Sequence, residues 1–220
     1  MIDEKFYTRT RIKTLGDLLA IPVIKKLVLD INHINVESVT FSIDSIAVLN
    51  EAQYGQISFF DNIKYKTDFL NSKTQFCIAH QRYISEAPLG MIIIPSNDPY
   101  RLYALCAEYL YKDTTVAGYL ATEYYQDNYG AKIHKNANLE ENIQTAFGVV
   151  IESGAYIGRD TIIKANSIIG TGCHIGRQCF IDSNVSVSHS LIGDKVTILA
   201  GAKIGQDGFG FAMGDRKSVV

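Results

Sequence analysis

The chain has 220 residues, of which 47% are hydrophobic, so it can form one large domain or two small ones around a real core. Its formal net charge of −2 gives no electrostatic reason to expect binding to nucleic acid or to an anionic membrane surface. No stretch approaches the roughly 20 apolar residues of a membrane span, and the N-terminal residues contain no apolar signal core, so we expect a cytoplasmic protein.

Residues 1–120 contain no short repeat and combine helical with strand-like patterns, which predicts a small α/β domain. Apolar residues spaced for one helix face occupy residues 14–29, although Pro22 must kink or split that helix. Another helix is predicted to begin at Pro99, directly after Asp98. Its predicted apolar face consists of Leu102, Leu105, Cys106 and Leu110.

Three other stretches of this region are typical of strands. Residues 39–49 alternate apolar and polar side chains, as a half-buried strand does. Residues 76–80 and 91–95 are continuous apolar runs, as in buried strands. Residues 121–131 are interpreted as a connector to the next region.

From residue 133 onward, one aliphatic residue recurs at every sixth position, and the register slips back by one residue at His189. Units of one short strand and one tight turn form the flat faces of a triangular coil of about 18 residues, and such coils stack at roughly 4.8 Å. We therefore predict that residues 132–220 form an incomplete left-handed parallel β-helix of hexapeptide repeats, with about four coils. The predicted inward anchors are Ile133, Leu139, Thr145, Ile151, Ile157, Ile163, Ile169, Ile175, Ile181, Val187, Ile192, Ile198 and Ile204.

The positions around the anchors also follow a rule. Thr145 is the polar member of the set, and we expect it to pair with the backbone of a neighbouring coil. Turns need residues that tolerate positive φ, a role that we assign to Gly158, Asn166, Gly170, Gly176 and Asn184. Small or β-branched residues four positions after an anchor are predicted to fill the corners: Ala137, Val149, Ala155, Thr161, Ser167, Cys173, Cys179 and Val185.

No cofactor or metal is predicted from the cysteines and histidines. The cysteines, Cys77, Cys106, Cys173 and Cys179, show no C-x-x-C spacing and are expected to be buried thiols. His134, His174 and His189 lie at different positions relative to their anchors, so they cannot form one stacked set of zinc ligands.

The repeat runs almost to residue 220 without an evident cap, although a solenoid must cover its last coil. We therefore expect either that the chain is truncated or that something outside this sequence covers its end.

Three motifs resemble one family. The segment 55–65, "GQISFFDNIKY", resembles the uridine-binding signature G-x-x-S-F-x-x-N-x-K-Y of the UDP-3-O-(3-hydroxyacyl)glucosamine N-acyltransferases of lipid A biosynthesis. The run "GQDGFGFA" at 205–212 resembles G-x-D-G-F-G-[FY]-A in the β-helix of that family, and residues 92–111 resemble its I-V-P-x-N-P-Y segment. The order of an α/β domain, a linker and hexapeptide coils also agrees.

The resemblance implies roles for individual residues. Phe59 and Tyr65 would sandwich a uracil ring, and Asn62 would form a hydrogen bond to its edge. The structural alternative for Phe59 is a core position in a strand. Asp207, Phe209 and Phe211 would lie beside the acyl-chain and active-site groove, or would form a structural turn only.

The family's catalytic base is a histidine in an A-H-N-V motif, which takes a proton from the sugar amine as it attacks an acyl thioester. None of the five histidines occupies that motif. We therefore name no catalytic residue, and we expect the histidine to lie beyond residue 220 and this chain to be inactive alone.

The implied enzyme transfers a 3-hydroxyacyl group from acyl carrier protein to a UDP-glucosamine derivative within a homotrimer. Because carrier proteins are acidic, basic residues on the coil are candidates for contact with the donor: Lys164, Arg177, Lys195 and Lys203. The alternatives are an acetyl-CoA-dependent sugar acetyltransferase and a non-catalytic module for nucleotide binding or trimerisation.

Overall fold

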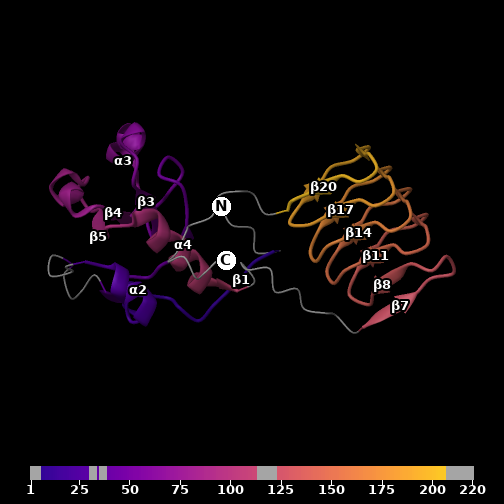
Figure 1. The fold of residues 1–220 in the computed structure, drawn as a ribbon, viewed down its shortest axis with the longest axis horizontal. Coiled ribbons are helices and arrows are strands. Elements are labelled where there is room, and N and C mark those ends of the chain that lie inside the picture. The colour runs from indigo at the N-terminus through magenta and orange to yellow at the C-terminus, as the bar shows by residue number, and fades with distance from the viewer. Residues whose placement is uncertain (1–5, 30–33, 35–38, 113–122, 207–220) are drawn as a thin grey trace. The chain divides into compact units, whose positions relative to one another are not determined.

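The structure is a computed structural model that describes residues 6–29, 34, 39–112 and 123–206. These residues form two compact units, which are described one at a time. Among the described residues, the α/β unit runs to Lys112 and the β-helix unit starts at Glu123 (Figure 1).

The α/β unit is built on a four-stranded parallel sheet with the order β2-β3-β4-β5. Its strands are β2 (Ser45–Ile46), β3 (Gln56–Phe60), β4 (Phe76–Ala79) and β5 (Ile92–Pro95). All four side chains of β4 are buried, and β5 is buried over its last three, which confirms the two apolar runs as core strands. A small antiparallel pair, β1 (Thr8–Arg9) with β6 (Tyr111–Lys112), completes the strands of this unit.

Short helices cover the sheet. They are α1 (Leu15–Leu19), α2 (Pro22–Leu27), α3 (Lys66–Asn71) and α4 (Pro99–Leu110), with the 3₁₀ turns η2 (Ile63–Tyr65) and η3 (Gln81–Glu86). Pro22 splits the first helical stripe as predicted, and it occupies the first position of α2. Asp98 caps α4 by accepting a hydrogen bond from Arg101 N at 3.1 Å. Helix α4 packs on β3 and β4 and buries Leu102, Cys106 and Leu110 in the main core.

The strand expected over residues 39–49 is mostly wrong, because only β2 forms there. Ile43, Ile46 and Leu49 are the buried residues of this stretch, and they lie three positions apart rather than two. The chain therefore turns as it crosses the core, and the alternation of residue types in the sequence does not correspond to an alternation of buried faces.

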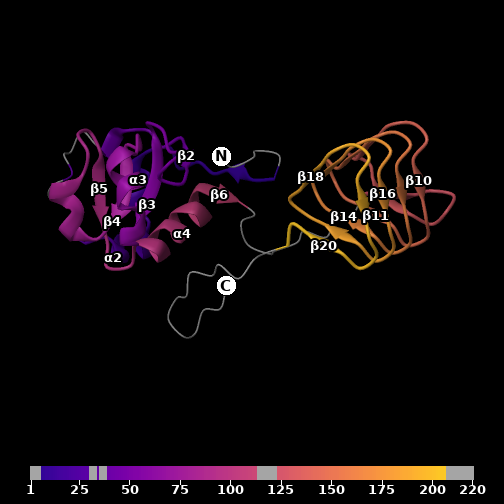
Figure 2. The same cartoon turned by 90° about the horizontal axis from the view of Figure 1, so that it is seen from above.

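Figure 2 shows the stacked coils of the β-helix unit. The coil is left-handed and parallel, and every predicted anchor lies on a strand. Ile151 pairs with Ile133 in one neighbouring coil and with Ile169, 18 residues later, in the other. The fold prediction is confirmed. The strands are β8 (Lys132–His134), β9 (Asn138–Leu139), β10 (Gln144–Thr145), β11 (Val150–Ile151), β12 (Tyr156–Ile157), β13 (Ile162–Ile163), β14 (Ile168–Ile169), β15 (His174–Ile175), β16 (Phe180–Ile181), β17 (Ser186–Val187), β18 (Leu191–Ile192), β19 (Thr197–Ile198) and β20 (Lys203–Ile204).

The missing residue near His189 is absorbed in a turn. His189 itself has a φ of 45°, and β17 and β18 on either side of it still pair in parallel with their neighbours. After the turn, Ile175 pairs with Ile192, which is 17 residues later instead of 18. The strand register therefore survives because the deletion lies in a corner and not in a face.

The turn residues obey a different rule from the one predicted. Apart from His189 and Gly205, positive φ in the coils occurs at the third position after an anchor, which confirms Asn166 and Asn184. Gly158, Gly170 and Gly176 follow their anchors directly, and their φ angles are not positive, so the prediction for these glycines is wrong. A Cβ at any of them would instead lie within 3 Å of the backbone of the next coil, so they are required by close approach.

The expected connector contains a strand that belongs to the coil. β7 (Tyr124–Gln126) pairs antiparallel with β8 and extends the sheet that contains the first coil. The turn after it carries Asp127, which accepts hydrogen bonds from the Thr145 hydroxyl and from the backbone of Tyr129 and Ala131. The partner of Thr145 is thus a carboxylate of this turn rather than the backbone of a neighbouring coil.

Glu140 ties three successive coils together on the outer surface. Its carboxylate accepts hydrogen bonds from Arg177 Nε at 2.9 Å and Nη2 at 2.8 Å, from Arg159 N at 2.9 Å, and from the Tyr156 hydroxyl. The hydrogen bonds from Arg177, followed by those from Tyr156 and Arg159, hold the pKa of Glu140 well below its usual value.

A lowered pKa in the folded state means that the interaction stabilises the fold above the pKa of the unfolded chain, about 4.5, and that this contribution is lost as the pH falls. Glu140→Gln should therefore lower the thermal midpoint slightly at pH 7, and the difference from wild type should shrink below about pH 4. Glu141→Gln, at the exposed neighbouring position, is the matched control. Thermal unfolding between pH 3 and 7 checks this, and a difference that does not change with pH would contradict it.

Among the helices of the described residues, none has the length and apolarity that crossing a bilayer requires.

Candidate functional site

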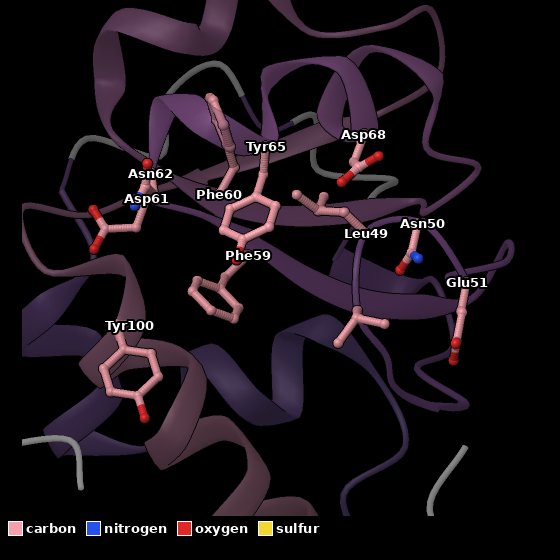
Figure 3. A pocket seen from close by; sticks show the side chains of 11 residues that line it. Leu49, Asn50, Glu51, Phe59, Phe60, Asp61, Asn62, Tyr65, Asp68 and Tyr100 are labelled. Atoms are coloured by element: carbon pink, nitrogen blue, oxygen red, sulfur yellow. The ribbon is translucent and has the colours of Figure 1, made fainter. Parts of the chain in front are cut away.

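A pocket of about 460 Å³ lies in the α/β unit at the carboxyl end of β3 (Figure 3). The parallel strands end together at this edge, where ligands of open α/β sheets commonly bind. Residues from the turn after β2, from the end of β3, from η2, from α3 and from the start of α4 line it. They are Val48, Leu49, Asn50, Glu51, Phe59, Phe60, Asp61, Asn62, Tyr65, Asp68 and Tyr100.

The pocket brings together the three residues that the sequence motif singles out: Phe59, Asn62 and Tyr65. The Phe59 ring is held from α4 by Tyr100 and Tyr103, at centroid distances of 5.6 and 4.7 Å. Phe59 thus packs against the main core and also lines the pocket. Its environment agrees in part with a core position in a strand and in part with a ligand-contacting position. Tyr65 is 56% exposed and closes the pocket from η2.

Asn62 has a structural task that its motif does not reveal. Its Oδ1 accepts a hydrogen bond from Lys64 N at 3.0 Å and caps η2. Within the part of the chain that the structure describes, its Nδ2 has no acceptor. The cap fixes the orientation of the amide, so that Nδ2 is the group available to a ligand.

Sequence reasoning missed the acidic residues of the pocket. Glu51, Asp61 and Asp68 line it together with the aromatic rings. Asp61 Oδ1 lies 2.9 Å from His80 Nε2, a contact between the ends of β3 and β4. Nothing in the spacing of these acids marks them, because they gather only when the strands and helices pack.

Other predicted residues are not part of this site. Asp207, Phe209 and Phe211 lie outside the described residues. Arg177 is engaged by Glu140, and the three lysines proposed to contact an acyl donor are exposed at different positions of their hexads. Within the described ranges, no group of three or more His, Cys, Asp or Glu side chains is arranged to hold a metal ion.

All four cysteines are buried free thiols, as predicted. Burial raises the pKa of Cys77, and it raises that of Cys106 to about 12, so neither is a thiolate at neutral pH.

Comparison with known proteins shows which family and which proteins this chain is similar to. Residues 40–109 match the family model of UDP-3-O-(3-hydroxymyristoyl) glucosamine N-acyltransferase, LpxD. UDP-3-O-acylglucosamine N-acyltransferase of Parvibaculum lavamentivorans is 37% identical over 180 residues, which cover 78% of this chain and 49% of that protein. UDP-3-O-acylglucosamine N-acyltransferase 2 of Legionella pneumophila is 34% identical over 173 residues, covering 79% of this chain and 48% of that protein.

The chain is a relative of the UDP-3-O-acylglucosamine N-acyltransferases. It spans about half the length of the curated relatives that it matches, 49% and 48% for these two. The segment that matches the N-acyltransferase model contains every residue that lines the pocket, from Val48 to Tyr100.

Among solved structures, a mutant of perosamine N-acetyltransferase from Caulobacter crescentus, in complex with CoA and GDP-perosamine, is 9% identical with a TM-score of 0.17. The match covers 72% of this chain and 94% of that one, and a TM-score of this size supports no argument.

Proposed function

We propose that the α/β unit binds the uridine part of a UDP-sugar, with the uracil ring between Phe59 and Tyr65 and its edge hydrogen-bonded to Asn62. The observation that supports this is the meeting of an aromatic pair and an oriented amide in one pocket, inside the segment that matches the N-acyltransferase family. Aromatic faces stack on a flat base with little loss of conformational freedom, and an amide supplies hydrogen bonds to its edge.

The same relationship supports a proposed reaction for the whole protein. It is the transfer of a 3-hydroxyacyl group from acyl carrier protein to the amine of a UDP-3-O-acylglucosamine, in the cytoplasm, during lipid A biosynthesis. The names of the relatives support the acyl acceptor, and the hexapeptide coil agrees with an acyltransferase.

Titration calorimetry of the 220-residue chain with UDP tests the pocket. Tyr65→Ala should weaken UDP binding about 10-fold or more, because stacking contributes about 1–3 kcal/mol per base. Phe59→Leu should weaken it similarly while keeping an apolar contact with the core. Tyr129→Ala, which removes a 70% exposed tyrosine from the β-helix unit, is the control. Equal affinity of all four proteins would refute the proposed site.

Thermal shift separates this proposal from the alternative of an acetyl-CoA-dependent acetyltransferase. UDP and UDP-3-O-acylglucosamine should raise the unfolding midpoint of the α/β unit, and CoA should not. Stabilisation by CoA alone would favour the acetyltransferase.

We also propose that the β-helix unit assembles as a homotrimer, because three triangular coils can cover flat faces around one axis. Sedimentation velocity should then give a mass near three times 24.4 kDa. A monomer at all concentrations would contradict the trimer without affecting the nucleotide site.

A further inference from the structure

The charged side chains that line the pocket proposed for uridine are all acidic. Glu51, Asp61 and Asp68 contribute carboxylates, whereas none of the described residues that line it is lysine, arginine or histidine. A pocket that recognises phosphate normally presents cations or backbone N–H groups at a helix N-terminus. The side chains of this lining are therefore unsuited to a diphosphate, and the start of α4, which also borders the pocket, is capped by the carboxylate of Asp98.

The nearest basic side chains along the chain do not alter that balance. Lys66 Nζ is held by Glu86 at 2.7 Å, and the His80 ring is held by Asp61. Lys64 and Arg101, each next to a lining residue in the sequence, do not themselves line the pocket. Among the described residues, Glu51 and Asp68 form no ion pair, since the pairs that the structure contains are Lys66–Glu86, His80–Asp61, Lys135–Glu123 and Arg177–Glu140.

The acids are distributed unequally around the aromatic rings. Figure 3 shows Asp61 and Asn62 on one side of Phe59 and Tyr65, with Glu51 and Asp68 on the opposite side. In uracil, the N3–H and O4 edge lies across the ring from N1, the atom that carries the ribose. A uracil whose O4 accepts a hydrogen bond from Asn62 Nδ2 thus directs its ribose toward Glu51 and Asp68.

We propose that Glu51 and Asp68 select the nucleoside by accepting hydrogen bonds from the ribose hydroxyls, and that the pocket excludes the diphosphate, which extends beyond it. Ionised carboxylates are acceptors only, so they match hydroxyl donors and repel phosphate oxygens. Carboxylates play the same part toward ribose in dinucleotide-binding folds. This inference rests on the proposed uridine site. It assigns to two acids the preference of that site for the ribose over the diphosphate.

Calorimetric titration of the 220-residue chain with uridine, 2′,3′-dideoxyuridine and UDP tests the assignment. Uridine should bind at least about 10-fold more tightly than the dideoxy nucleoside, which lacks the hydroxyls that donate to the acids. UDP should bind no more tightly than uridine. Its affinity should also not fall between 50 and 500 mM salt, the opposite of recognition by cations.

Charge-neutral variants locate the effect. Asp68→Asn and Glu51→Gln should each raise the affinity for UDP relative to uridine about threefold, the size expected for one screened charge at roughly 6 Å. The matched control is Asp160→Asn in the β-helix unit, where asparagine suits the positive φ of 59°. An unchanged ratio in the pocket variants would overturn the assignment.

The remaining outcomes separate this inference from the proposed function. If uridine and dideoxyuridine bind equally, or if UDP binds far more tightly and weakens with salt, the role of the acids is wrong and the uridine site stands. If no uracil compound binds, the proposed site fails, and the inference fails with it.

Discussion

Replacing Ile169 with alanine is expected to destabilise the β-helix unit by about 4 kcal/mol, within the range for large-to-small changes at fully buried positions. Ile169 is 0% exposed and lies between Ile151 and Val187 in the adjacent coils. The cavity cannot close by a shift of the coils, because hydrogen bonds of 2.9 Å from Glu152 N to Ile169 O and of 2.8 Å from Gly170 N to Val187 O fix their spacing.

The neighbouring residue supplies the control. Ile168 belongs to the same strand but faces outward and is 44% exposed, so Ile168→Ala should cost less than about 1 kcal/mol. Urea unfolding followed by circular dichroism compares the two variants. Similar losses for both would contradict the inward stacking, unless the loss for Ile168→Ala grows with protein concentration, which would identify a subunit contact.

The β-helix could be predicted from sequence because each coil repeats one local rule. The anchors from Ile133 to Ile204 need only their own spacing to be recognised, and the slip at His189 is visible as a lost residue. Parallel pairing then follows, because each strand meets the same strand of the next coil. A repeat of this kind therefore predicts the fold from local sequence alone, with little need for information on tertiary contacts.

The α/β unit shows where such reasoning fails. Residues 39–49 have the composition of an alternating strand, but their buried positions are set by how the chain turns across the sheet. Asn62 was recognisable as a ligand-binding candidate, whereas its capping of Lys64 N depends on where η2 begins. The sequence motif indicates the aromatic pair, but the acids Glu51 and Asp68 come from separate elements and join the pocket only through packing.

Coil-to-coil distance is also invisible in the sequence. Gly158, Gly170 and Gly176 are glycines at turns. Glycine can be required at a turn because φ is positive or because there is no space for a Cβ, and the sequence does not distinguish the two reasons. The structure separates the two at these three positions, because none has positive φ and a Cβ at each would lie within 3 Å of the next coil.

That separation leads to a prediction of large effect for a column of three glycines. Gly158, Gly176 and Gly193 each follow an anchor on the sheet β9-β12-β15-β18. A Cβ at Gly158 would lie 2.6 Å from the carbonyl carbon of Gly176, and a Cβ at Gly176 would lie 2.5 Å from that of Gly193. Favourable carbon contacts are about 3.5–4.0 Å, so alanine at either position must push two coils apart.

We expect Gly158→Ala and Gly176→Ala each to destabilise the β-helix unit by about 3 kcal/mol, the upper end of the usual cost of overpacking, because the obstructing atoms are backbone. Gly193→Ala should be neutral or should stabilise by up to about 1 kcal/mol, since a Cβ there meets no atom of the described residues within 4 Å and alanine restricts the unfolded chain. Urea unfolding of the three variants measures the contrast. If Gly193→Ala were as damaging as Gly158→Ala, the cost would arise from the turn conformation that the three positions share and not from the approach of the next coil.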